Sequence, residues 1–485
     1  MSNMTDILNE IAKKHLYIGG KWQEAASYEP LHSPYHGGLI AEVAEASADE
    51  TRQAIAAAAE ATTTMRDMPA HQRAAILEQL ARLLEERKEE AARLIALEGS
   101  KPLKAARAEV ARTIETYKFS AEEAKRIHGE TVPLDAAATG EGKFGYTIKE
   151  PVGVVGAITP FNFPMNLVAH KVGPALAAGN TIVLKPAEQT PLSSFLLAEL
   201  LEQAGLPAGA LNVVTGDGKT VGDTIVTDDR VKALSFTGSP AVGISIRSRS
   251  GLKKVTLELG SNSGLIIDKD TDVAAMIDRA VSGAFGNQGQ VCISVQRIYV
   301  HEHIFDTFVE QFVTATAKLK LGDPLEEDTD VAAMISEKEQ KRALEWIAEA
   351  IEQGAEVVCG NEVQDGCLKP TVLLNVSPEA RVACREVFAP VVMINRVRDM
   401  EEAVQAVNHS DYGLQAGIYT TQLDTAFLAI RQLEVGGVIV NDIPSFRVDQ
   451  MPYGGVKQSG IGREGVKYAM EDMLETKFVV FNQPR

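Results

Sequence analysis

From residue 150 onward, short apolar runs alternate with segments long enough to form helices, and this alternation restricts the chain to few folds. The first set of runs is VGVVGAI (152–158), NTIVLKP (180–186), LNVVTG (211–216) and VKALSFTG (231–238). A strand that is apolar throughout is buried on both faces, and a helix-length crossover joins parallel neighbours. These runs predict a parallel β-sheet with helices on both faces.

A second set of apolar runs predicts a second α/β lobe. It consists of KKVTLELG (253–260), RIYVH (297–301), AEVVCG (355–360), PVVMINRV (390–397) and GGVIVND (436–442). The chain has 485 residues, which leaves room for two to three domains. Two lobes are therefore the simplest arrangement.

The residues before the first lobe have a helical pattern. Ser47 and Glu50 have the spacing of a capping box. Residues 69–128 carry apolar side chains at steps of three and four, with Glu, Arg and Lys between them. We expect amphipathic helices packed on a core.

Two segments lie outside the alternation. GETVPLD (129–135) leads into FGYTIKE (144–150), and KFVVFN (477–482) has strand composition with no helix after it. A strand left over at the end of the chain presents an edge that must be paired or covered. We expect this strand to pair with another subunit.

Composition excludes several classes of protein. Lys and Arg number 48 against 66 Asp and Glu, a net charge of −18, which argues against a nucleic-acid binder. The four cysteines, Cys292, Cys359, Cys367 and Cys384, show no C-x-x-C spacing, so we expect neither a disulfide scaffold nor a bound metal. No apolar run reaches about 18 residues. Because the start, MSNMTDILNEIAKK, is acidic and lacks an apolar stretch, we expect a cytoplasmic protein without a membrane segment.

Three short segments could hold an anion or a ribose. FTGSPAVG (236–243) follows a strand and opens a helix, so Gly238 and Ser239 could bind phosphate, although an ordinary turn has the same pattern. Lys185 and Glu188 end another run and could bind ribose hydroxyls or simply face solvent. GIGREG (460–465) is the only literal G-x-G-x-x-G, but it follows a polar loop, so we interpret it as a turn.

Cys292 and Glu258 are the candidates for chemistry. Cys292 ends the small, polar stretch GNQGQVC, whose backbone N–H groups could stabilise a thiolate. The other three cysteines are interpreted as packing residues. Glu258 lies in an apolar run, where an unpaired carboxylate is costly and its pKa rises, as suits a general base. A buried ion pair with a lysine is the alternative.

Together these segments resemble the aldehyde dehydrogenase superfamily over nearly the whole chain. The motifs in chain order are PFNFP (160–164), KPAEQTP (185–191), FTGS (236–239), LELG (257–260), GQVC (289–292), EVFAPV (386–391) and PYGGVKQSG (452–460). Any one of them is weak, but all seven in this order are highly specific.

The resemblance implies a catalytic role for three residues. Cys292 would attack the aldehyde carbonyl, and the Asn162 amide, with the Cys292 backbone N–H, would hold the developing oxyanion. Hydride would pass to a nicotinamide cofactor and leave a thioester. Glu258 would activate the water that hydrolyses this thioester.

The resemblance also implies a cofactor site. Lys185 and Glu188 would hold the adenine-side ribose, Ser239 the pyrophosphate, and Glu386 the nicotinamide ribose, with Phe388 packed nearby. The remaining expected cofactor contacts are Thr159, Pro160, Phe161, Gly238 and Gly260. Because the Glu188 carboxylate would repel a 2′-phosphate, NAD is favoured, while Lys185 beside it keeps NADP possible.

The fold implied is α/β, with two Rossmann-like lobes built on parallel sheets and a small β oligomerisation extension. Residues 1–128 and 149–257 would form the dinucleotide-binding domain, and residues 258–445 the catalytic domain. Residues 129–148 and 470–485 would form the extension, in a homodimer or homotetramer.

The segments at 441–455 and 462–473 are similar to the branch that oxidises lactaldehyde and small phosphono- or sulfo-substituted aldehydes. Arg447 could bind such an anion with both ends of its guanidinium group, and Arg112 is a second candidate. A salt bridge is the alternative for each. The chain departs from many relatives at SNSGL (261–265) and at Phe163, where a histidine is common.

Two other functions remain to be weighed. A coenzyme A-acylating enzyme would share the fold, but Glu258 argues against it because a hydrolytic base would compete with the acceptor thiol. A non-catalytic structural protein could also retain the fold, but Cys292 and Glu258 are both present. We therefore expect a small aldehyde as the substrate and oxidation to a free acid.

Overall fold

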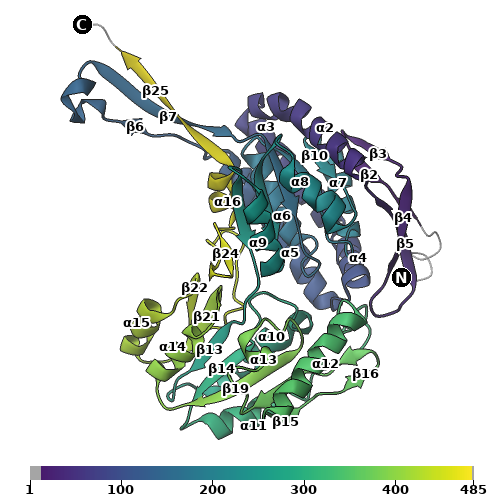
Figure 1. Cartoon of the computed structure of the whole chain (residues 1–485), viewed down its shortest axis with the longest axis vertical. Helices are drawn as coiled ribbons and strands as arrows, with labels where there is room; N and C mark the ends of the chain where they lie inside the picture. Colours follow the sequence, from purple (N-terminus) through teal and green to yellow (C-terminus); the bar gives the residue numbers. More distant parts are fainter. Residues whose placement is uncertain (1–11, 483–485) are drawn as a thin grey trace.

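The computed structural model describes residues 12–482, which form two α/β lobes and a projecting arm (Figure 1). Residues 1–11 and 483–485 lie outside the described residues. They include most of the acidic start of the chain and the last residues of the expected oligomerisation extension. None of the helices within residues 12–482 is long and apolar enough to cross a membrane.

The first lobe contains an eight-stranded sheet. Its order is β24 (Gly460–Ile461), β12 (Lys254–Glu258), β11 (Val231–Thr237), β8 (Val154–Ile158), β9 (Thr181–Lys185), β10 (Leu211–Val213), β2 (Leu16–Ile18) and β3 (Lys21–Gln23). The five strands from β12 to β10 are parallel, as the first set of apolar runs predicts. The grouping of residues 253–260 with the second lobe is wrong, because β12 pairs with β11.

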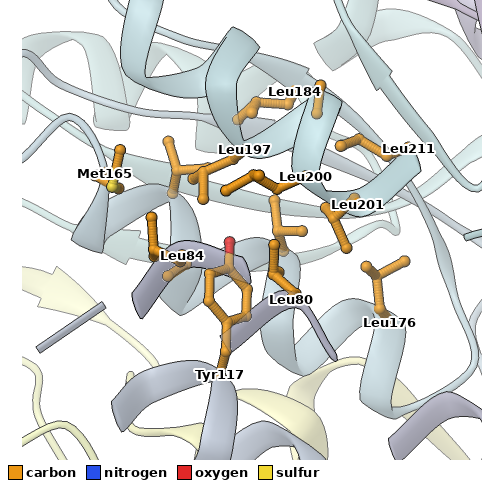
Figure 2. Packing of buried hydrophobic residues seen from close by; sticks show 14 of the residues in the cluster. Leu80, Leu84, Tyr117, Met165, Leu176, Leu184, Leu197, Leu200, Leu201 and Leu211 are labelled. Atoms are coloured by element: carbon orange, nitrogen blue, oxygen red, sulfur yellow. The ribbon is translucent and has the colours of Figure 1, made fainter. Parts of the chain in front are cut away.

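The strands of this sheet are apolar throughout because both faces are covered. Val154 and Val183 pack in one hydrophobic cluster, whereas Val155 and Leu184 pack in another on the opposite face. Side chains alternate along a strand, so each face requires its own apolar set. Figure 2 shows the second cluster, where leucines of α3 and α7 meet Tyr117 of α5.

The predicted helical region is confirmed as consecutive helices. They are α2 (Ala48–Asp67), α3 (Ala70–Glu86), α4 (Lys88–Gly99) and α5 (Leu103–Ala124), followed by α6 (Asn166–Ala177), α7 (Leu192–Gln203), α8 (Asp223–Thr227) and α9 (Pro240–Arg249). The capping box is present, since the Ser47 side chain accepts from the Glu50 N–H and the Glu50 side chain accepts from the Ser47 N–H. The short strands β1 (Lys13–Lys14), β4 (Ser27–His32) and β5 (Leu39–Glu45) form a separate sheet.

The second lobe contains a seven-stranded sheet. Its order is β15 (Glu356–Cys359), β18 (Thr371–Leu374), β19 (Val391–Val397), β14 (Arg297–His301), β13 (Gly264–Ile267), β21 (Gln415–Tyr419) and β22 (Gly437–Val440). All pairs are parallel except β15 with β18. Its helices are α10 (Val273–Phe285), α11 (Phe305–Thr316), α12 (Glu337–Glu352), α13 (Arg381–Cys384), α14 (Met400–Asn408) and α15 (Leu423–Gln432).

The projecting arm is a small antiparallel sheet in the order β25 (Leu474–Asn482), β7 (Lys143–Pro151) and β6 (Thr131–Val132) (Figure 1). The terminal strand therefore pairs along one edge with β7 of its own chain. Its other edge is the outer edge of this sheet. The expected fold class, α/β with two lobes and a small β extension, is confirmed.

The GIGREG segment, which the sequence analysis interpreted as a turn, begins as the edge strand β24 and bends at Gly462 and Gly465. Gly460 belongs to β24, which runs antiparallel to β12, and it pairs with Glu258. Gly460, Gly462 and Gly465 all have positive φ angles, and a Cβ on Gly465 would collide with the Met451 carbonyl oxygen. The segment leads into α16 (Val466–Asp472) and then into β25.

Candidate active site

Four neighbouring parallel strands end along one edge of the first sheet. The register pairs Thr237 with Glu258, and Ile158 with Lys185. The residues just beyond these ends include Thr159 after β8 and Gly238 after β11. Because ligands of such sheets bind at the carboxyl ends of the strands, this edge is where a site is expected.

The loop that carries Cys292 is held by its own glutamine side chains. The Gln288 amide donates to the carbonyl oxygens of Ser100 at 2.7 Å and Ala333 at 2.9 Å, and the Gln290 side chain accepts from the Ile335 N–H at 3.0 Å. Gly289 has φ +66°, and a Cβ there would collide with a neighbouring carbonyl. The polar residues before Cys292 thus fix the loop in place.

The Cys292 thiol is partly buried and contacts Tyr453. Its Sγ lies 2.8 Å from the Tyr453 hydroxyl oxygen. Arg447 lies over the Tyr453 ring, with its guanidinium carbon 3.7 Å from the ring centroid. Burial raises the pKa of the Cys292 thiol to about 12, although Tyr453 and Arg447 both act to lower it.

Asn162 lies beside the same loop. Its side-chain amide donates to the Gln290 carbonyl oxygen at 2.9 Å, and the Asn287 amide donates to the Asn162 carbonyl oxygen at 3.3 Å. An amide nitrogen has two hydrogens, so one remains for a second acceptor. Asn162 and Cys292, which are 130 positions apart in the sequence, are thus attached to one loop.

Glu258, the last residue of β12, is buried, and neither of its carboxylate oxygens has a hydrogen-bond partner among the described residues. Burial raises its pKa well above the ordinary value, and the nearby Glu464 raises it further. The alternative for Glu258, an ion pair with a lysine, is not found among the described residues. The buried lysine, Lys171, pairs with Glu464 at 2.8 Å.

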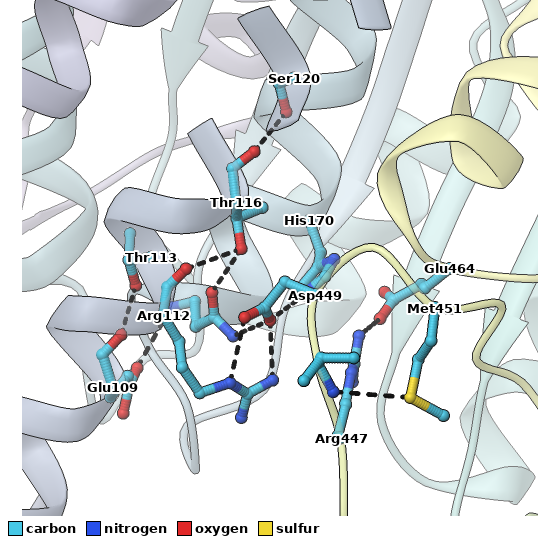
Figure 3. Close-up of polar contacts among 12 residues, drawn as sticks. Glu109, Arg112, Thr113, Thr116, Ser120, His170, Arg447, Asp449, Met451 and Glu464 are labelled. Carbon is cyan, nitrogen blue, oxygen red and sulfur yellow. Dashed lines mark hydrogen bonds and ion pairs between the residues drawn. The ribbon is translucent and has the colours of Figure 1, made fainter. Parts of the chain in front are cut away.

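Glu464 joins two cations around the site. One oxygen accepts from Lys171 at 2.8 Å. The other accepts from Arg447 at 2.9 Å, the contact drawn in Figure 3. Burial opposes ionisation of Glu464, but these two cations together lower its pKa far below the ordinary value. Sequence reasoning missed Lys171, Tyr453 and Glu464. A signal existed for Lys171, since it is the only lysine or arginine in the buried helix NLVAHKVGPALA.

As with Arg447 and Glu464, Arg112 forms a salt bridge, which was the alternative to substrate binding for both arginines. It contacts Asp449 through Nη2 at 2.7 Å and Nε at 3.2 Å (Figure 3). His170 and Asn166 also contact Asp449, at 2.9 and 3.1 Å. Burial raises the pKa of Asp449, but His170 and Arg112 lower it far more. Arg112 therefore anchors the loop that presents Arg447 two residues earlier.

Glu386 and Gly260 lie in contact. The Glu386 carboxylate accepts from the Ser261 N–H at 2.9 Å, and a Cβ on Gly260 would collide with it. Burial raises the pKa of Glu386 to about 7. Phe388, with φ +48°, packs edge-on against Phe161 at 5.8 Å between ring centroids.

The residues expected to hold the adenine side of a cofactor lie at the ends of β9 and β11. Lys185 is buried, and its amino nitrogen lies 3.6 Å from a carboxylate oxygen of Glu188, whose side chain is exposed. Glu188 also lines a hollow of about 480 Å³. Ser239 is the N-cap of α9, and its side chain makes no capping bond. The first N–H groups of α9 are thus not capped by that side chain, which fits a pyrophosphate.

Comparison with known proteins identifies the family. The model of the aldehyde dehydrogenase family matches residues 22–479. The chain belongs to the aldehyde dehydrogenase family. It is 47% identical to a 3-sulfolactaldehyde dehydrogenase of Priestia aryabhattai, covering 98% of this chain and 99% of that one, and 41% identical to a lactaldehyde dehydrogenase of Methanococcus aeolicus, covering 96% and 100%.

Among solved structures, the chain resembles aldehyde dehydrogenase 21 of Physcomitrella patens, determined with the reaction product succinate. The TM-score is 0.95 at 43% identity, covering 98% of this chain and 99% of that one. A glyceraldehyde-3-phosphate dehydrogenase of Methanocaldococcus jannaschii was determined with NADP (TM-score 0.91, 39% identity, 94% and 100% covered). A Bacillus cereus aldehyde dehydrogenase was determined with NAD+ (TM-score 0.95, 36% identity, 99% of each chain covered). The protein is thus an NAD(P)-dependent enzyme that oxidises an aldehyde to an acid.

Cofactor binding is expected to weaken as the pH falls through about 7. Burial raises the pKa of Glu386 to about 7, so below that pH the carboxyl is protonated and loses acceptor capacity for ribose hydroxyls. Titration of NAD+ by calorimetry between pH 6 and 8.5 measures this change. Glu386→Gln should bind more weakly and without the inflection, whereas Glu379→Gln, on the exposed surface nearby, should behave like the parent. A dissociation constant of the parent that does not change with pH would exclude this role.

Proposed function

We propose that this aldehyde dehydrogenase oxidises a small anionic aldehyde, with Cys292 as nucleophile, Asn162 as oxyanion donor and Glu258 as general base. The observation that carries the proposal is the placement of Arg447, whose guanidinium group is held over Tyr453 while the Tyr453 hydroxyl contacts the Cys292 sulfur. A fixed cation one side chain away from the nucleophile suits a substrate whose aldehyde and anion are separated by a short carbon chain.

The first step is attack by sulfur. The Cys292 thiolate forms a C–S bond with the aldehyde carbon, and the carbonyl π electrons move to oxygen. The free hydrogen of the Asn162 amide and the Cys292 backbone N–H would hold that oxygen. Donors of this kind contribute roughly 3–4 kcal/mol each to the transition state. NAD(P)+ held at the expected cofactor site would supply the acceptor for the hydride of the former aldehyde carbon, which would leave a thioester on Cys292.

The second step is hydrolysis. Glu258 takes a proton from a water molecule, whose oxygen attacks the thioester carbon, and the C–S bond breaks to release the acid and the Cys292 thiolate. A carboxyl with a raised pKa is a stronger base than an ordinary glutamate. Its two unpartnered oxygens leave it free to accept the proton.

The charge balance around the site favours an anion. Lys171 and Arg447 contribute two positive charges, against the one negative charge of Glu464 that pairs with both. The Nε of Arg447 is buried and has no hydrogen-bond partner among residues 12–482, so the guanidinium group retains donor capacity. The names of two relatives, a 3-sulfolactaldehyde dehydrogenase and an enzyme determined with succinate, support an anionic substrate.

Removing Arg447 is expected to impair anionic substrates selectively. Arg447→Ala should raise KM for 3-sulfolactaldehyde and succinic semialdehyde by about tenfold or more, as loss of a charged hydrogen bond implies. Because Arg447→Ala also removes the ion pair with Glu464 and the contact with the Tyr453 ring, kcat/KM should fall for every aldehyde, but KM for propanal and lactaldehyde should rise at least about threefold less than KM for the anionic aldehydes. NADH production gives these values, and Arg396→Ala, a surface arginine, is the control. Equal effects on charged and neutral aldehydes would refute anion binding by Arg447.

For the cofactor, we propose a preference for NAD with NADP accepted. The exposed carboxylate of Glu188 would bind the ribose hydroxyls and repel a 2′-phosphate, while the Lys185 amino group 3.6 Å away reduces that repulsion. The first lobe would serve as the dinucleotide-binding domain and the second as the catalytic domain.

We also propose that the arm joins subunits into a homodimer or homotetramer. The apolar side chains of Phe144, Phe478, Val480 and Phe481 are exposed on this arm, and the outer edge of β25 has free backbone groups. Exposed apolar strand edges invite pairing with another chain.

Removing the outer strand is therefore expected to dissociate the assembly. A chain truncated after Glu475, or one carrying Val480→Lys and Phe481→Lys, should be smaller by light scattering after size exclusion than the parent. The double variant keeps β25 and tests the surface alone. An unchanged oligomer in both variants would sink the proposal.

A further inference from the structure

The contact between Cys292 and Tyr453 is not required by the mechanism above, yet it is the only hydrogen bond found for the Cys292 sulfur among the described residues. Tyr453 is 2% exposed, so its hydroxyl has no ready exchange with bulk water. A phenol can both donate and accept, and a thiol does the same weakly. Once the thiol loses its proton to solvent, the tyrosine hydroxyl is the donor.

We propose that Tyr453 is a positioning residue for the nucleophile, which holds the Cys292 thiolate through a hydrogen bond from its hydroxyl while the Arg447 guanidinium group holds the phenol ring in place. This inference rests on the proposed role of Cys292. It assigns to Tyr453 a function that a phenylalanine in the same pocket could not perform.

The surroundings of the sulfur explain why such a donor is needed. Glu258 and Glu386 both raise the pKa of Cys292, in addition to burial, whereas Tyr453 and Arg447 lower it. Two carboxyl groups thus raise the pKa of the thiol, whereas one cation and one hydroxyl lower it. The phenol is the only one of these groups in hydrogen-bond contact with the sulfur.

The Tyr453 phenol keeps its proton when the thiolate forms, because burial and the neighbouring negative charges outweigh the effect of Arg447. Burial raises the pKa of Tyr453 well above its ordinary value, and the charges of Cys292 and Glu258 raise it as well, while Arg447 opposes them. The phenol therefore stays protonated and remains a donor when the thiolate forms. The cation lies 3.7 Å from the ring centroid, a favourable distance for a cation–π contact.

The hydrogen bond has two opposite effects on reactivity. It increases the fraction of thiolate at neutral pH, but a stabilised thiolate is intrinsically less nucleophilic. The sulfur becomes a poor acceptor as the C–S bond forms, so the bond to Tyr453 weakens during attack. Loss of the hydroxyl should therefore lower the reaction rate where the thiol is mostly protonated, and should not lower the rate of the fully ionised thiolate.

The experiment measures alkylation of Cys292 by iodoacetamide, followed by mass spectrometry of its peptide, between pH 7 and 10. Sulfur displaces iodide and forms a thioether, so no cofactor or substrate is needed. Tyr453→Phe should react about tenfold more slowly than the parent at each pH below the thiol pKa. The dehydrogenase kcat/KM with 3-sulfolactaldehyde should fall by a similar factor.

A donor of increased strength provides the opposite test. With 3-fluorotyrosine at position 453, a nearly isosteric and more acidic phenol, alkylation should be faster than in the parent, which a merely structural role would not produce. Tyr299→Phe, which removes a hydroxyl that contacts Arg297, is the matched control and should change nothing.

Equal alkylation rates for the parent, Tyr453→Phe and the fluorinated protein would overturn the inference. This failure is distinct from failure of the proposed function. The proposed function fails if Cys292→Ala retains dehydrogenase activity, because Cys292 would then not be the nucleophile. Alkylation of Cys292 reports on the hydrogen bond whether or not the enzyme turns over.

Discussion

The Glu464 carboxylate, held between Lys171 and Arg447, is the interaction on which the arrangement of the site depends. Lys171 belongs to α6, which covers the first sheet, and Arg447 belongs to a loop that follows the second sheet. A buried ion pair that loses one partner costs about 3–5 kcal/mol, because an uncompensated charge remains. Glu464 thus joins the two lobes where the aldehyde would bind, and the same loop presents Tyr453 to Cys292.

A second set of buried charges holds that loop from the opposite side. Asp449 receives Arg112, His170 and Asn166, and the three donors come from two helices of the first lobe. The neighbouring His170 and Lys171 on α6 therefore contact two carboxylates on different segments, Asp449 after β22 and Glu464 after β24. This explains why α6 carries two ionisable side chains in a helix that is otherwise apolar or small, and why Arg447 keeps a fixed position close to the nucleophile.

Much of this structure could be predicted from the sequence, because strand patterns and short motifs are local. The apolar runs predicted the parallel sheet. The motifs singled out Cys292, Asn162 and Glu258, whose catalytic roles stay predictions. The assignment of residues 253–260 to the second lobe failed because an apolar run does not reveal its neighbours. The partners of Arg112, Arg447 and Lys171 could not be inferred either. These partners, Asp449 and Glu464, lie in segments without a periodic pattern, and they are far along the chain from Arg112 and Lys171.

The most direct test of the account is the covalent state of Cys292 during turnover. Glu258→Gln, mixed with NAD+ and 3-sulfolactaldehyde, should form NADH in a single burst and retain an acyl group that intact-mass and peptide analysis place on Cys292. The reason is that thioester formation does not need the base, whereas hydrolysis does. An unmodified Cys292 after the burst, or an acyl group on another residue, would contradict the account.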